Sequence, residues 1–139
     1  MPSFSKTSLA RLASCDFRLQ MILHIAIKYI DIVVLEGHRG QREQDEAYER
    51  GASKVKWPNG KHNKIPSMAV DIWPWTQEGK VDWKDIAAAA RMMGYVQRIG
   101  DEIGVKLRFG FDWDGDFRTA GIDPNETFLD APHVEVVEE

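Results

Sequence analysis

The chain has 139 residues, of which 43% are apolar and 29% charged, and its formal net charge is −4. This length and composition predict one globular domain over residues 1–139 and exclude a fibrous or largely disordered chain. The negative charge argues against a general nucleic-acid binder, and the single cysteine, Cys15, excludes an intramolecular disulfide.

The N-terminal part predicts two helices. Thr7 or Ser8 caps a short first helix, and Asp16 caps a second helix that runs to about Tyr29. Four apolar residues of this second helix recur every four positions and so share one face: Phe17, Met21, Ile25 and Tyr29. No apolar stretch of signal-peptide length precedes it, and the run 19–35 is too short and too polar to span a bilayer.

The rest of the chain predicts four short strands and two more helices. The strands are expected where short apolar or β-branched runs occur, at 32–35, 68–73, 106–109 and 133–137. The helices are expected at 41–50, closed by Gly51, and from residue 83 or 84 to 104, capped by Asp82. Residues 52–66 are predicted to be an exposed loop, and residues 111–129 a long loop rich in Asp and Gly. This order of elements favours an α+β fold with a small, mainly antiparallel sheet packed against helices.

Two histidines and two aspartates form the candidate site. His62 lies in the first loop, Asp71 ends a short apolar run, and Asp130 stands three residues before His133. Two imidazoles and one carboxylate can hold a catalytic zinc ion, while a second carboxylate acts on the attacking water as general base. Composition alone leaves other readings open. His62 also fits an exposed loop, Asp71 a turn cap, and Asp130 the turn before Pro132.

These residues stand in motifs that resemble a known family. The segments His62…Ser67-Met68-Ala69-Val70-Asp71 and Asp130-x-x-His133-Val134-Glu135 are similar to those of peptidoglycan-cleaving zinc peptidases. That family includes D-Ala-D-Ala carboxypeptidases and phage L-alanyl-D-glutamate endopeptidases. The resemblance continues in the same order through most of the chain, at Gly37-His38-Arg39 with Gln44, at 80–83 and at 107–116. It implies a Hedgehog/DD-peptidase-like fold and a single zinc peptidase catalytic domain.

The resemblance also implies a role for each residue. His62, Asp71 and His133 would bind Zn²⁺, and Asp130 would be the catalytic acid and base. Arg39 would lie near the site, where its guanidinium can bind a substrate carboxylate or a developing oxyanion through paired hydrogen bonds. A surface salt bridge is the alternative for Arg39. Gln44, in the helix that follows Arg39, would orient this turn.

Some features depart from the family pattern or admit another use. Gly60 stands where Ser is common, Ser67 stands where Gly is usual, and the gap from His62 to Asp71 is two residues longer. The acids at 112, 114, 116 and 123 partly resemble a calcium loop, but Phe117 takes the place of the glycine that such a loop needs. Four tryptophans could stack on sugar rings, although core packing is the commoner role: Trp57, Trp73, Trp75 and Trp113.

We therefore expect a zinc-dependent peptidoglycan endopeptidase of the endolysin type that hydrolyses the L-alanyl-D-glutamate bond of the stem peptide. Asp at position 130 and the missing secretion signal favour this branch of the resemblance. The alternatives are a D-Ala-D-Ala carboxypeptidase with the same zinc site and a non-catalytic, zinc-containing wall-binding module. We expect a monomer that does not insert into membranes and stays in the cytoplasm of the producing bacterial cell until it is released to the wall.

Overall fold

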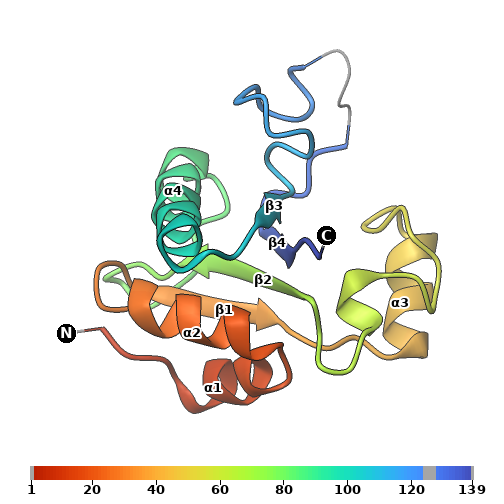
Figure 1. Cartoon of the computed structure of the whole chain (residues 1–139), viewed down its shortest axis with the longest axis horizontal. Coiled ribbons are helices and arrows are strands. Elements are labelled where there is room, and N and C mark those ends of the chain that lie inside the picture. Colours follow the sequence, from red (N-terminus) through yellow and green to blue (C-terminus); the bar gives the residue numbers. More distant parts are fainter. Residues whose placement is uncertain (1, 124–127, 139) are drawn as a thin grey trace.

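A computed structural model describes residues 2–123 and 128–138 and has an α+β fold (Figure 1). Four strands form one antiparallel sheet in the order β1-β2-β4-β3: β1 Ile32–Glu36, β2 Ala69–Pro74, β4 His133–Val136 and β3 Leu107–Phe109. The helices are α1 Lys6–Ala13, α2 Phe17–Ala26, α3 Gln41–Glu49, the 3₁₀ helix η1 Lys61–Asn63 and α4 Ile86–Ile103. The predicted fold class is confirmed.

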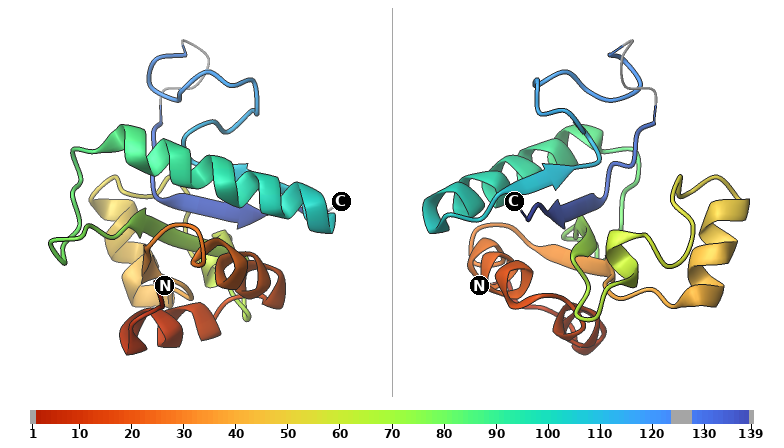
Figure 2. Two further views of the ribbon diagram at one scale, coloured as in Figure 1. Left: turned by 90° about the vertical axis from the view of Figure 1, so that its left-hand side faces the viewer. Right: turned by 45° about the vertical axis from the view of Figure 1, so that its right-hand side comes forward.

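Helices α1, α2 and α4 form a layer against the sheet (Figure 2), whereas α3 lies apart, beyond the end of β1 (Figure 1). In this layer α2 packs on α4, α4 packs on β2 and β3, and α1 packs on β1. The main core lies between these elements and includes Leu12, Leu19, Ile22, Leu23, Val34, Met92 and Val96. None of the described helices is both long and apolar enough to cross a membrane.

Side chains alternate along β2 and β4, because successive residues of a strand point to opposite faces. One set belongs to the main core: Val70, Ile72, Val134 and Val136. The polar residues Asp71, His133 and Glu135 alternate with this set and therefore project from the other face. Asp71 and His133 are direct partners across the β2–β4 pair. The strands thus place two of the predicted zinc ligands side by side.

An irregularity in β1 adds a third polar residue to this row. Val34 pairs with Ile72, but the register then shifts and Glu36 pairs with Asp71. Such a bulge inserts one extra residue and re-aims the side chains that follow it. Without the shift, Glu36 would lie opposite Val70 instead of Asp71.

Two helix starts differ from the prediction. The N-cap of α1 is Ser5, whose hydroxyl accepts a hydrogen bond from the Ser8 amide. Ser8 is instead buried, and its hydroxyl accepts from the amide of Val34. The N-cap of α4 is Asp85 rather than Asp82, because Asp85 accepts from the amide of Ala88. Ser8 is drawn away by β1, whereas the carboxylate of Asp82 accepts a local hydrogen bond from the amide of Lys84.

The prediction for α2 was right about its cap and wrong about its end. Asp16 accepts a hydrogen bond from the amide of Arg18, as expected, but the helix ends at Ala26. The residues spaced by four include exposed ones, since Phe17 and Met21 are 67% and 42% exposed. The buried side of α2 is formed by Leu19, Ile22, Leu23 and Ala26. The helix is apolar on most sides, so its spacing could not identify the face that packs on α4.

Candidate metal centre

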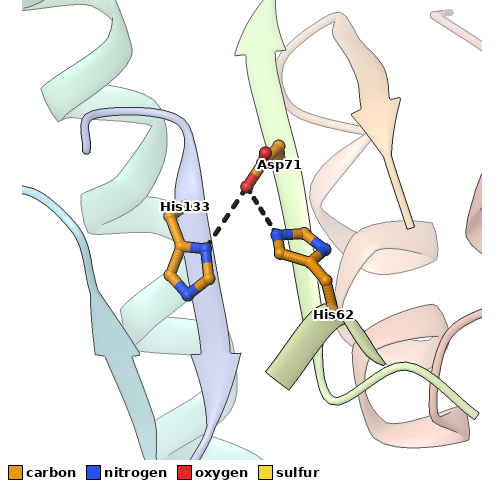
Figure 3. A group of neighbouring side chains, drawn as sticks. All are labelled: His62, Asp71 and His133. Atoms are coloured by element: carbon orange, nitrogen blue, oxygen red, sulfur yellow. Dashed lines mark hydrogen bonds and ion pairs between the residues drawn. The ribbon is translucent and has the colours of Figure 1, made fainter. Parts of the chain in front are cut away.

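The three predicted ligands meet on the sheet face opposite the helices (Figure 3). Each offers one ligand atom, and these atoms lie within 4.8 Å of one another. Oδ1 of Asp71 is 3.1 Å from Nε2 of His62 and 3.4 Å from Nδ1 of His133. Both imidazoles are buried. His62, Asp71 and His133 therefore form a group that could hold a metal ion.

His62 is carried by η1, within the segment that was predicted to be an exposed loop. That prediction is wrong for His62, which is only 3% exposed. Its Nδ1 lies 2.7 Å from the carbonyl oxygen of Gly37, which can only accept a hydrogen bond. The proton of the neutral ring is therefore assigned to Nδ1, and the lone pair of Nε2 faces Asp71. This is the arrangement that a metal-binding histidine needs.

A buried amide holds η1 against α3. Gln44 is 1% exposed, and its Oε1 accepts hydrogen bonds from Arg39 Nη1 at 3.0 Å and Asn63 Nδ2 at 3.1 Å. Its Nε2 donates to the carbonyl of Val55 at 2.6 Å. Oδ1 of Asn63 in turn accepts from the amide of Gly60. Gln44 thus links the turn at Arg39 to the loop that carries His62, in agreement with the orienting role expected for it.

Arg39 lies beside the ligand group but is already engaged. Its Nε and Nη2 form a paired contact with the two carboxylate oxygens of Glu36, at 2.8 and 2.9 Å. Nη2 also lies 3.8 Å from Oδ2 of Asp71. The side chain is 11% exposed, so this is a partly buried pair rather than a surface salt bridge. Arg39 can orient Asp71 and place a positive charge beside it.

Asp130 stands at the entrance to the group. Its Oδ2 is 3.8 Å from Nδ1 of His133, and its side chain is 25% exposed. The backbone of Asp130 packs directly on Gly110, where a Cβ would overlap the Asp130 carbonyl oxygen. The Asp130 amide also donates to the Gly110 carbonyl at 3.1 Å. Gly110 is therefore required for the close approach that positions this carboxylate.

The surroundings of Asp71 and Asp130 shift the pKa values of the two carboxyl groups in opposite directions. Burial opposes the charge of Asp71, but the two neighbouring histidines outweigh it and hold its pKa well below the usual range. Burial raises the pKa of Asp130, and the negative charge of Asp71 raises it further. One carboxylate is thus kept ionised, as a metal ligand must be, while the other moves toward the range that suits proton transfer.

His133 is affected by the same charges. Burial lowers its pKa, but hydrogen bonds to Asp71 and Glu135 outweigh this and raise it from 6.5 to about 9.

Two acidic neighbours of the site, Glu36 and Glu135, were not predicted as site residues from the sequence. The available signals were local, since Glu36 stands three residues before Arg39 and Glu135 two residues after His133 in a strand.

A cleft of about 440 Å³ opens over the ligand group. Besides His62, Asp130 and His133, its lining includes basic and aromatic side chains: Arg39, Lys54, Lys61, Arg108, Trp113 and Phe128. The Trp113 ring lies 5.3 Å from that of His133, and its Nε1 donates to the Phe128 carbonyl. Trp113 is therefore part of the cleft wall. A second hollow of about 410 Å³, beside α4, contains none of the three ligands.

The acidic loop is partly held by bonds within itself. Asp112, Asp114 and Asp116 offer carboxylate oxygens within 4.8 Å of one another. The carboxylate of Asp112, however, accepts hydrogen bonds from the backbone amides of Gly115, Asp116 and Phe117. It therefore shapes the turn in this loop. Residues 124–127 of the predicted loop lie outside the described residues.

Comparisons with known proteins point to one peptidase family. The family model described as "Phage L-alanyl-D-glutamate peptidase" matches residues 2–137. The L-alanyl-D-glutamate peptidase of Escherichia phage T5 is 31% identical over 138 residues, covering 96% of this chain and 97% of that protein. Peptidoglycan L-alanyl-D-glutamate endopeptidase CwlK of Bacillus subtilis (strain 168) is 29% identical over 133 residues, which cover 81% of this chain but only 64% of CwlK.

A solved structure supports the fold. The crystal structure of Serratia marcescens L-Ala D-Glu endopeptidase ChiX superposes with a TM-score of 0.74. The match covers 97% of this chain and 90% of that chain, at 22% sequence identity. At this identity the likeness concerns the fold alone.

Proposed function

This chain belongs to the phage L-alanyl-D-glutamate peptidase family, and we propose that it hydrolyses the L-alanyl-D-glutamate bond of the peptidoglycan stem peptide with Zn²⁺ as its cofactor. The observation that carries the proposal is the convergence of His62, Asp71 and His133 beneath the cleft, with Asp130 beside them. The substrate class follows the names of the relatives, and the metal follows the chemistry of the donor atoms.

The donor set fits zinc. Zinc sites with catalytic activity typically use three protein ligands from histidine and carboxylate side chains and keep one position open. Here Nε2 of His62, Oδ1 of Asp71 and Nδ1 of His133 supply that set from one side, and the cleft lies on the other. A bound zinc ion would polarise the scissile carbonyl and bring the pKa of a water molecule near neutrality.

Asp130 is proposed to move the proton. Its carboxylate accepts a proton from the attacking water and returns it to the leaving amine, as a general base and then a general acid. Burial and the negative charge of Asp71 raise the pKa of Asp130, so its carboxylate is a stronger base toward the attacking water than an ordinary aspartate. The close packing of its backbone on Gly110 holds it in place.

Arg39 is proposed to act through Asp71. Its paired contact with Glu36 and its hydrogen bond to Gln44 hold the guanidinium 3.8 Å from Asp71. From this position it fixes the orientation of the ligand carboxylate and offsets the negative charge of Asp71 and Glu36. Capture of a substrate carboxylate or an oxyanion by Arg39, which the resemblance suggested, stays a prediction.

Digestion of purified peptidoglycan, followed by mass spectrometry of the new chain ends, tests the proposal. We expect new L-Ala carboxyl ends and D-Glu amino ends, which disappear with a strong chelator and return with added Zn²⁺. Asp130→Asn should lower kcat/KM by about 10²–10⁴-fold with unchanged zinc content. Released D-Ala would indicate a carboxypeptidase instead, and wall binding without new ends would indicate a binding module. Full activity in metal-free protein would rule out zinc.

A further inference from the structure

A second carboxylate lies behind His133, on the side away from the other ligands. Glu135 is 4% exposed, and its Oε1 is 2.8 Å from Nε2 of His133. Its Oε2 accepts hydrogen bonds from Arg108 Nη2 at 2.8 Å and Nε at 3.2 Å. Both carboxylate oxygens of this buried side chain are therefore bonded, one to the proposed metal ligand and one to a guanidinium.

The sheet explains this arrangement. His133 and Glu135 are two residues apart in β4, so they project from the same face and lie side by side. Glu135 is paired across the sheet with Arg108 of β3 on one side and Ala69 of β2 on the other. The small side chain of Ala69 leaves room above β2, while Arg108 supplies the positive charge. The register between β3 and β4 thus brings the charge of Arg108 to the carboxylate.

The contact with Glu135 decides which ring nitrogen of His133 carries the proton. An ionised carboxylate can only accept, so the nearby Nε2 must donate. When the ring is neutral, as a metal-binding histidine must be, its lone pair is then on Nδ1, which lies 3.4 Å from Oδ1 of Asp71. His62 presents the other nitrogen, Nε2, because its Nδ1 is bonded to the Gly37 carbonyl. The two histidines are thus oriented by different acceptors, one a backbone carbonyl and the other a charged side chain.

We propose that Glu135, held in place by Arg108, is a positioning residue that keeps His133 in its Nε2–H form and aims Nδ1 at the metal position. The inference rests on the proposed zinc site but not on the bond that is cut. Burial of a carboxylate is costly unless it is paired and hydrogen-bonded, and Glu135 has two such partners. Partners of this kind raise the basicity of a metal-binding histidine, and their removal typically weakens metal affinity by about 10–100-fold.

A simpler role must be separated from this one. The Arg108–Glu135 contact is also a cross-strand ion pair, and Arg108 is 44% exposed. Such a pair can join β3 to β4 whether or not a metal ion is bound. If it acted only as a brace between β3 and β4, its loss would change stability and leave the properties of His133 unaltered. The experiment therefore measures the histidine and the metal directly.

The first measurement needs no variant. In the zinc-loaded wild type, long-range ¹H–¹⁵N NMR of the histidine rings reports which nitrogen carries the proton. We expect a proton on Nε2 of His133 and on Nδ1 of His62. A proton on Nδ1 of His133 would overturn the proposal.

The second measurement is zinc affinity by competition with a chromophoric chelator. Glu135→Gln keeps the shape but replaces a charged acceptor with a neutral amide, so we expect affinity to fall at least about 10-fold. Arg108→Met should cause a smaller loss, because it acts only through Glu135. The matched control is Glu102→Gln, which breaks the exposed Arg98–Glu102 pair on α4 and should leave affinity unchanged.

The outcomes distinguish this inference from the proposed function. Affinity of Glu135→Gln within twofold of the wild type would overturn the positioning role even if the enzyme cuts peptidoglycan as proposed. A wild type that binds zinc but cuts no L-alanyl-D-glutamate bond would remove the proposed function and leave the affinity difference standing. If Glu135→Gln fails to fold, as judged by circular dichroism, Arg108→Met and the wild-type NMR spectrum decide the question.

Discussion

The two walls of the cleft are held in different ways. On the α3 wall, residues 39–67, the buried amide of Gln44 joins Arg39, Asn63 and Val55, which come from separate parts of that wall. The loop wall, residues 110–123, contributes Trp113 to the cleft, and within it the carboxylate of Asp112 accepts hydrogen bonds from the backbone amides of residues 115–117. In the α3 wall, the buried side chain of Gln44 positions the segment that carries His62. The loop wall is held largely by hydrogen bonds within itself.

This difference predicts which of the two segments determines the geometry of the site. A change in the α3 wall should reach His62 and weaken the whole fold, because buried hydrogen bonds that lose a partner are costly. A change at the tip of the loop wall should stay local, since regions with few buried contacts open at little cost in free energy. Three substitutions test this comparison, from the largest expected effect to the smallest.

Gln44→Ala should have the largest effect. It removes the shared acceptor of Arg39 and Asn63, and we expect the free energy of unfolding to fall by about 2–3 kcal/mol. Urea denaturation measures this loss, and chelator competition measures the accompanying fall in zinc affinity. Gln41→Ala, at an exposed position of the same helix, is the control and should change stability by less than about 0.5 kcal/mol. Equal effects of the two substitutions would contradict a special role for the α3 wall.

Asp16→Asn should have an intermediate and pH-dependent effect. Asp16 caps α2, and its amide donates to the carbonyl of Ser67, which anchors the end of the α3 wall. A hydrogen bond from Arg18 holds the pKa of Asp16 below its usual 3.8. Because the pKa is lowered on folding, the stabilisation is present above pH 3.8 and is lost as the pH falls through the folded-state value.

Asparagine retains the cap but lacks the charge, so the comparison isolates the ion pair. Near neutral pH we expect the wild type to be more stable than Asp16→Asn by about 1 kcal/mol. The difference should shrink as the pH falls below 3.8. Urea midpoints of both proteins across this range provide the measurement. A difference that stays constant with pH would mean that the charge of Asp16 does not stabilise the fold.

Phe117→Asn should have the smallest effect. Phe117 is 86% exposed at the tip of the loop wall and has a φ of 66°, in the left-handed region that asparagine tolerates better than phenylalanine. We expect the free energy of unfolding to change by less than about 0.5 kcal/mol, because the side chain is exposed and asparagine tolerates this backbone conformation. Thermal unfolding measures it. A loss above about 1 kcal/mol would show that the loop wall is anchored as firmly as the α3 wall.

Much of the fold could be predicted because its signals are local. The β-branched run at 32–35 and the aspartate cap of α2 depend on neighbouring residues, and both were predicted correctly. The inward face of α2 could not be predicted, because Phe17 and Leu19 are both apolar and only contact with α4 separates them. The burial of His62 was missed for a similar reason. Its segment has the composition of an exposed loop, but the ring of His62 packs between the Gly37 carbonyl and Asp71 of β2, which are distant from it in the chain.

The sequence by itself determined the chemistry of the site, because the donor types and their order along the chain are local properties. His62, Asp71, Asp130 and His133 were predicted from the sequence because their motifs resemble those of a known family. Only the tertiary structure decided how these groups are held. The bulge that brings Glu36 beside Asp71, and the registers that bring Arg108 to Glu135, join strands far apart in the chain. Such pairings depend on the packing of the whole sheet, and so no local pattern carries them.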